Sequence, residues 1–66
     1  MKRFIVVESA GNVYIYDRNK KIGYKQIEGE FVSMKVNNET AFSKVVVYMD
    51  KVYETDKLPL GFNLLI

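Results

Sequence analysis

The chain has 66 residues, 48% of them hydrophobic, and ten basic residues nearly balance eight acidic ones to give a formal net charge of +2. It contains no histidine, cysteine or tryptophan. It therefore lacks the side chain that most often transfers protons at neutral pH, cannot form a disulfide and cannot build a zinc site of the ordinary kind, which needs cysteine or histidine. We expect one domain, residues 1–66, that is not an enzyme and needs no cofactor or metal.

The small size predicts association. A chain of this length buries only about 60% of its unfolded surface, so a monomer is marginally stable. Small domains without disulfides or metals often gain stability by oligomerising, and we expect a homo-oligomer. No apolar run approaches the roughly 18 residues of a transmembrane helix. The absence of cysteine fits a reducing compartment, so we expect a cytoplasmic protein without membrane contact.

Two strands are predicted at the start of the chain. In residues 2–8, the adjacent apolar side chains of 4–7 point to both faces, which indicates a strand covered on both sides. The turn that follows contains Gly11 and Asn12, which tolerate positive φ. In residues 13–16, valine and isoleucine share one face and two tyrosines the other.

Two further strands are predicted before residue 38. In residues 21–28, Gly23 indicates a bulge or a close approach of another part of the backbone. Glu28, Gly29 and Glu30 then form a tight reversal. Residues 31–37 alternate cleanly between apolar and polar side chains. Four short strands joined by short turns predict an antiparallel meander.

Residues 41–54 fit two structures. Phe42, Val45, Val46 and Met49 have helical spacing, and Asn38 or Thr40 can cap such a helix. The β-branched run that follows Lys44 favours a strand instead. We favour the strand and keep the helix as the alternative.

These patterns predict a mainly β fold, a small antiparallel meander that closes into a barrel or curved sheet of five or six short strands. The alternative is a four-stranded sheet with one helix at about 41–54, an α+β fold. The expected core comprises Ile5, Val7, Val13, Ile15, Ile22, Val32, Met34, Val36, Val45 and Val47.

The last nine residues are strongly apolar. Pro59 excludes a central strand position there. We expect this segment to be buried, either in the core or against another subunit. The candidate protein interface comprises Phe31, Leu58, Leu60, Phe62, Leu64, Leu65 and Ile66.

A second candidate surface combines tyrosines with basic residues in the second and third strands. Tyrosine rings on a sheet can stack on unpaired bases while basic side chains contact phosphates. The residues concerned are Tyr14, Tyr16, Arg18, Lys20, Lys21, Tyr24 and Lys25. The nearly balanced charge argues against a dedicated phosphate groove.

No motif in the sequence points to catalysis, since the serines have no histidine partner and the glycines form no phosphate-binding loop. We therefore expect a non-enzymatic protein-interaction module, a regulator or inhibitor that binds a larger protein of unknown identity and also self-associates. The alternative is a small β-barrel that binds single-stranded nucleic acid.

Overall fold

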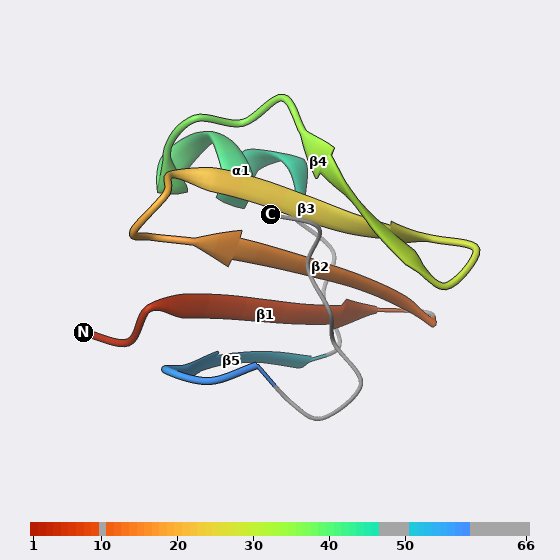
Figure 1. Ribbon diagram of the computed structural model, residues 1–66, viewed down its shortest axis with the longest axis horizontal. Helices are drawn as coiled ribbons and strands as arrows, with labels where there is room; N and C mark the ends of the chain where they lie inside the picture. Colours follow the sequence, from red (N-terminus) through yellow and green to blue (C-terminus); the bar gives the residue numbers. More distant parts are fainter. Residues whose placement is uncertain (10, 47–50, 59–66) are drawn as a thin grey trace.

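Five strands form a single sheet in the computed structural model, which describes residues 1–9, 11–46 and 51–58. The spatial order is β4-β3-β2-β1-β5, and every pair of neighbours is antiparallel. The strands are β1 (Phe4–Ser9), β2 (Asn12–Asp17), β3 (Ile22–Ile27), β4 (Glu30–Met34) and β5 (Lys51–Thr55). The predicted mainly β meander is confirmed, and β5 extends it by returning beside β1 (Figure 1).

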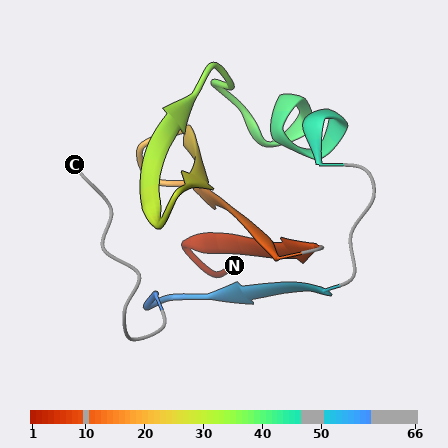
Figure 2. The same cartoon turned by 90° about the vertical axis from the view of Figure 1, so that its right-hand side faces the viewer.

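The sheet is open and curved. Among the described residues, the outer strands β4 and β5 do not pair with each other, so the strands do not close into a barrel. Figure 2 shows the hairpin of β3 and β4 turned away from the plane of β1 and β5. The sequence analysis expected either a barrel or a curved sheet, and the structure shows the curved sheet.

Local residues determine the conformations of the two loops that flank β3, one before it and one after it. Between β3 and β4, Glu28 and Gly29 both have positive φ, 52° and 84°, as a two-residue type I′ hairpin turn requires. Between β2 and β3, the Asp17 carboxylate accepts hydrogen bonds from the backbone N–H groups of Asn19 (2.9 Å) and Lys20 (3.3 Å). Both hairpins are thus fixed by local chemistry that the sequence displays.

The helix α1 spans Glu39–Val45, and the strand that we favoured for this part of 41–54 is wrong. Asn38 caps the helix, since its Oδ1 accepts a hydrogen bond from the Ala41 N–H at 2.8 Å. Phe42 is buried under the helix, and this tertiary contact outweighs the β preference of the valines that follow. The last part of the segment 41–54, from Lys51 onward, belongs to the strand β5.

The helix covers one face of the sheet, and each face carries its own apolar cluster. The helix-side cluster consists of Ile5, Val7, Tyr16, Val36, Phe42 and Val46. The opposite cluster consists of Phe4, Val6, Val13, Ile15, Tyr24 and Phe31. Because β1 contributes to both, the prediction of a strand covered on both sides is confirmed.

Most described residues of the predicted core are buried or half-buried, but two of them are exposed. Ile5, Val7, Val13, Ile15 and Val36 are buried, and Ile22 and Met34 are half-buried. Val32 is 37% exposed because it lies on the edge strand, and Val45 is 56% exposed because it lies on the outer side of α1. Val47 lies outside the described residues.

Gly23 allows the helix and the chain before it to lie directly on the sheet. A methyl group at this position would collide with the side chain of Val36 and would come within 3.2 Å of the Phe42 ring. The sequence predicted a bulge or a close approach of backbone at this position. The close neighbours are instead the side chains of Val36 and Phe42, and Phe42 lies beside Tyr16 in the helix-side cluster.

Candidate binding surface

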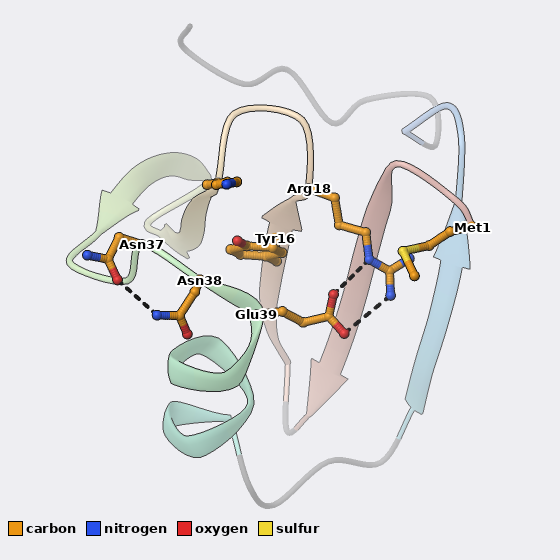
Figure 3. A pocket seen from close by; sticks show the side chains of 7 residues that line it. Met1, Tyr16, Arg18, Asn37, Asn38 and Glu39 are labelled. Atoms are coloured by element: carbon orange, nitrogen blue, oxygen red, sulfur yellow. Dashed lines mark hydrogen bonds and ion pairs between the residues drawn. The ribbon is translucent and has the colours of Figure 1, made fainter.

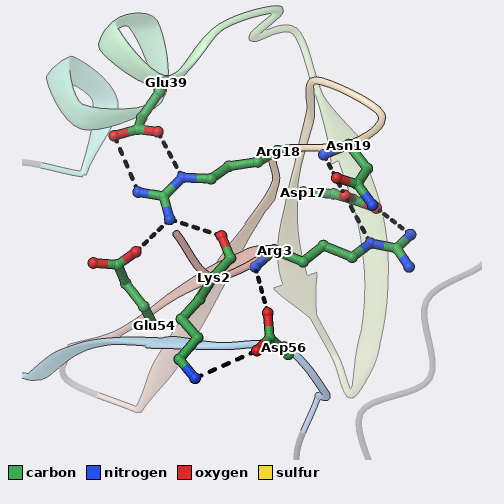
Figure 4. Close-up of polar contacts among 8 residues, drawn as sticks. All are labelled: Lys2, Arg3, Asp17, Arg18, Asn19, Glu39, Glu54 and Asp56. Carbon is green, nitrogen blue, oxygen red and sulfur yellow. Dashed lines mark hydrogen bonds and ion pairs between the residues drawn. The ribbon is translucent and has the colours of Figure 1, made fainter.

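Arg18, which directly follows β2, forms hydrogen bonds to α1, to β5 and to the N-terminal segment at one end of the sheet (Figure 4). Its Nε donates to Glu39 of α1 at 2.8 Å, and its Nη1 donates to the Lys2 carbonyl at 2.8 Å and to Glu54 of β5. Hydrogen bonds from Arg18 hold the pKa of Glu39 below its ordinary value, and those with Glu39 and Glu54 raise the pKa of Arg18. The guanidinium is therefore occupied by internal partners.

Arg3 and Asp17 form a second ion pair nearby (Figure 4). Arg3 binds the Asp17 carboxylate through Nε (3.1 Å) and Nη2 (2.9 Å), and Asp17 is fully buried. Burial acts to raise the pKa of Asp17, but the hydrogen bonds from Arg3, Lys20 and Asn19 outweigh it, so the pKa is lowered. This pair holds the loop between β2 and β3 against the start of β1.

An open cleft of about 330 Å³ lies beside the Arg18 cluster (Figure 3). Its lining residues are Met1, Tyr16, Arg18, Lys21, Asn37, Asn38 and Glu39. Most of its polar groups already have partners: Arg18 binds Glu39, and Asn38 donates to the Asn37 side-chain oxygen at 3.2 Å.

Tyr16 and Glu39, two ionisable residues of the cleft, have shifted pKa values. The pKa of Glu39 is lowered, and burial raises the pKa of Tyr16 above its ordinary value of about 10. A general acid or base works best with a pKa near the working pH, and neither group meets that condition. Tyr16 and Glu39 are therefore poorly matched to proton transfer at neutral pH.

The seven residues of the predicted nucleic-acid surface do not gather on one face. Tyr16 and Tyr24 are only 2% and 3% exposed, and they belong to the clusters on opposite faces of the sheet. Tyr14 is half-buried at the border of the helix-side cluster, and Arg18 is held by carboxylates. Lys20, Lys21 and Lys25 are exposed. The rings of Tyr16 and Tyr24 thus have no free surface on which a base could stack.

The predicted protein interface is described only in part. Phe31 is buried in the opposite cluster, so it belongs to the core and not to the surface. Leu58 is half-buried and packs against the same cluster. The other members, Leu60, Phe62, Leu64, Leu65 and Ile66, lie outside the described residues, and their role stays a prediction.

An apolar surface that the sequence analysis missed lies on the hairpin of β3 and β4. Lys25 pairs with Tyr14 on one side and with Val32 on the other, so these three side chains lie in one row on the helix-bearing face. Ile27, two residues beyond Lys25, is on the same face and is 48% exposed. We call Tyr14, Lys25, Ile27 and Val32 the hairpin patch.

The alternation of residues 31–37 concealed this surface, because an alternating strand was assumed to turn its valines inward. The Glu28–Gly29 turn is the signal that could have revealed it. A tight hairpin turn beside Ile27 places that residue at the hairpin tip, where α1 does not cover the sheet (Figure 2).

Together these features define a small open antiparallel sheet with one covering helix, an internally paired charge cluster at one end and an uncovered apolar hairpin. Among the residues that the structure describes, no group of three or more acidic, histidine or cysteine side chains could hold a metal ion. No helix in the same residues is long and apolar enough to cross a membrane. Comparisons with protein families, curated proteins and solved structures found no match.

Proposed function

We propose that this chain is a non-enzymatic protein-interaction module, a regulator or inhibitor that binds a larger protein through the hairpin patch. The observation that carries the proposal is the exposure of Ile27 (48%) and Val32 (37%) at diagonal positions on one face of the hairpin formed by β3 and β4. Single exposed apolar side chains are ordinary on protein surfaces. Several exposed apolar side chains gathered on one face are typical of binding surfaces.

The chemistry of the rest of the molecule supports binding. The chain has neither histidine nor cysteine. The ion pairs of Arg3 and Arg18 join segments of the fold to one another, which is a structural use of charge.

The test is a pull-down from a lysate of the source organism with two matched double variants. Ile27→Ser with Val32→Ser removes the apolar part of the hairpin patch. Val45→Ser with Val52→Ser removes two valines on α1 and β5 that are 56% and 55% exposed. Each lysate is divided and one half is treated with nuclease, and both protein and nucleic acid are assayed.

We expect the wild-type chain and the Val45/Val52 variant to retain the same stoichiometric protein after nuclease treatment. The Ile27/Val32 variant should bind that protein about tenfold or more weakly, as removal of interface anchors commonly does. Equal retention by both variants would contradict a role for the hairpin patch. Recovery of nucleic acid alone would favour the single-stranded nucleic-acid alternative.

A further inference from the structure

The hairpin patch and its border carry two charges of opposite sign. Lys25 belongs to the patch, and Glu30 pairs with Ile27 across the hairpin, so Glu30 lies on the same face. Both charged side chains are exposed. Neither forms an ion pair with a described residue, whereas Arg3 and Arg18 are paired within the molecule. Lys25 and Glu30 are therefore available to a binding partner.

Four positions of the hairpin form a rectangle on this face. Lys25 pairs with Val32, and Ile27 pairs with Glu30 in the next row. The two apolar residues, Ile27 and Val32, thus occupy one diagonal, and the two charged residues occupy the other. Rows on one face of a sheet lie about 7 Å apart and neighbouring strands about 5 Å apart, so all four side chains fit within a single contact.

This arrangement is complementary to a second copy of itself. A twofold axis that lies in the interface along the apolar diagonal places Ile27 on Ile27, and Val32 on Val32, of the other copy. The same rotation exchanges the charged corners, so Lys25 of each copy faces Glu30 of the other. An interface between identical subunits requires such self-complementarity. The two charges cancel on each copy, so two copies of net charge +2 can meet here without local repulsion.

The surroundings of the rectangle leave room for a second copy. The helix α1 does not cover the tip of the hairpin (Figure 2). Glu28 lies in the turn beyond the paired rows, and Tyr14 continues the row of Lys25 toward the centre of the sheet. Tyrosine is enriched at interfaces relative to other surfaces. The contact can therefore extend from the tip of the hairpin to Tyr14.

Building on the proposed function, we infer that the hairpin patch binds the same patch of a second copy in a twofold dimer, and that this dimer excludes the larger partner. Dimerisation buries Ile27 and Val32, the side chains that the proposed function assigns to the partner. One surface cannot bind both at once. The dimer is therefore a self-inhibited form, and its dissociation exposes the binding surface.

Charge reversal in two separate variants tests the dimer. Sedimentation equilibrium of the purified full chain measures the dissociation constant. Lys25→Glu opposes two carboxylates at each charged contact, and Glu30→Lys opposes two ammonium groups. Each variant alone should dissociate about tenfold or more readily than the wild type. An equimolar mixture of the two should associate about as tightly as the wild type, because each contact then joins opposite charges. Lys57→Glu, exposed and outside the patch, changes the net charge as Lys25→Glu does and should not weaken the dimer.

A chemical crosslink tests the exclusion of the partner. The chain has no cysteine, so an introduced cysteine is unique. Ile27→Cys should be joined to its counterpart by a short bis-maleimide, because these two positions face each other across the twofold axis. Val52→Cys, exposed on β5, should not be joined. The crosslinked Ile27→Cys dimer should retain no partner protein from the lysate, whereas the same variant before crosslinking should retain it.

A mixture that associates no more tightly than the single variants would overturn the dimer, and a partner retained by the crosslinked dimer would overturn the exclusion. The dimer and the proposed function can fail separately. If the chain is monomeric at every concentration but retains a lysate protein that depends on Ile27 and Val32, the proposed function stands and the dimer is wrong. If the dimer shows the expected charge dependence but no protein is retained, the dimer stands and the proposed function fails.

Discussion

The ring of Phe42 lies against the ring of Tyr16, with centroids 5.4 Å apart and planes tilted by 36°. This contact joins α1 to the centre of the sheet, because Tyr16 lies on β2 and is itself buried. A helix of seven residues is too short to be stable alone in water. The position of α1 therefore depends on Phe42.

Phe42→Ala should destabilise the protein by about 3 to 5 kcal/mol, since it removes a fully buried aromatic side chain. Urea denaturation measures the change, and hydrogen exchange of the α1 amides reports whether the helix remains docked. Val45→Ala on the exposed side of the same helix is the control, with an expected change within about 0.5 kcal/mol. Similar losses for both variants would show that Phe42 does not seat the helix.

Gly23→Ala should cost about 1 to 3 kcal/mol, because the new methyl group collides with Val36 and crowds Phe42. The added variant Val36→Ala removes the colliding methyl groups. The two changes together should therefore cost less than the sum of their separate effects in a double-mutant cycle. Additive losses would indicate that the contact between positions 23 and 36 is not the cause.

Asp17→Ala should destabilise the protein by about 3 kcal/mol, because it leaves the Arg3 guanidinium and the loop N–H groups of Asn19 and Lys20 without their acceptor. Asp17→Asn keeps one side-chain oxygen to accept from the loop, but it loses the charge and replaces the oxygen that accepts from Arg3 Nη2 with an NH2 donor. It should cost less, about 1 to 2 kcal/mol. Thermal denaturation of both variants separates the two contributions, and equal losses would assign the whole effect to the ion pair.

The acid side of the stability profile should depend on three carboxylates. Hydrogen bonds lower the pKa of Asp17, Glu39 and Asp56 in the folded chain. Protons then bind more tightly to the unfolded chain, so the stabilisation is complete above about pH 5 and is lost as the pH falls below about 4. Denaturation at a series of pH values should show this loss, and Asp17→Asn should reduce its steepness. An unchanged slope in that variant would contradict the role of Asp17.

The alkaline side of the same profile should depend on buried tyrosines. Burial raises the pKa of Tyr16 and Tyr24 in the folded chain. Their stabilising effect is therefore complete below about pH 10 and is lost as the pH rises through the folded values. With no histidine or cysteine side chain, stability should change little between about pH 5 and pH 9. A transition near pH 6 to 7 would be incompatible with this assignment.

We also expect the chain to self-associate, since 66 residues bury too small a fraction of their surface for high stability as a monomer. Sedimentation over a range of concentrations measures the mass. Leu64→Asp, in the apolar C-terminal segment, should shift the chain toward the monomer, whereas Lys57→Ala should not. A monomeric mass at every concentration would refute self-association.

Much of the sheet could be predicted because its signals are local. The turn at Glu28 and Gly29 and the alternation of Val13 and Ile15 depend on neighbours in the sequence, and the structure confirms both. The candidate site could not be predicted in the same way. Whether Tyr24 is exposed depends on what covers its face of the sheet, and a single strand does not contain that information.

The sequence by itself determined the mainly β class and the positions of the first four strands, and it offered Asn38 as one of two possible caps for a helix. Each of these follows from backbone preferences and side-chain spacing over a few residues. Only the tertiary structure decided that residues 39–45 form a helix, that Tyr16 and Tyr24 are buried on opposite faces, and that Val32 and Ile27 are left uncovered. Those outcomes depend on which strand lies at the edge of the sheet and which face α1 covers. They arise from contacts between residues far apart in the chain, whose burial energy exceeds local preference.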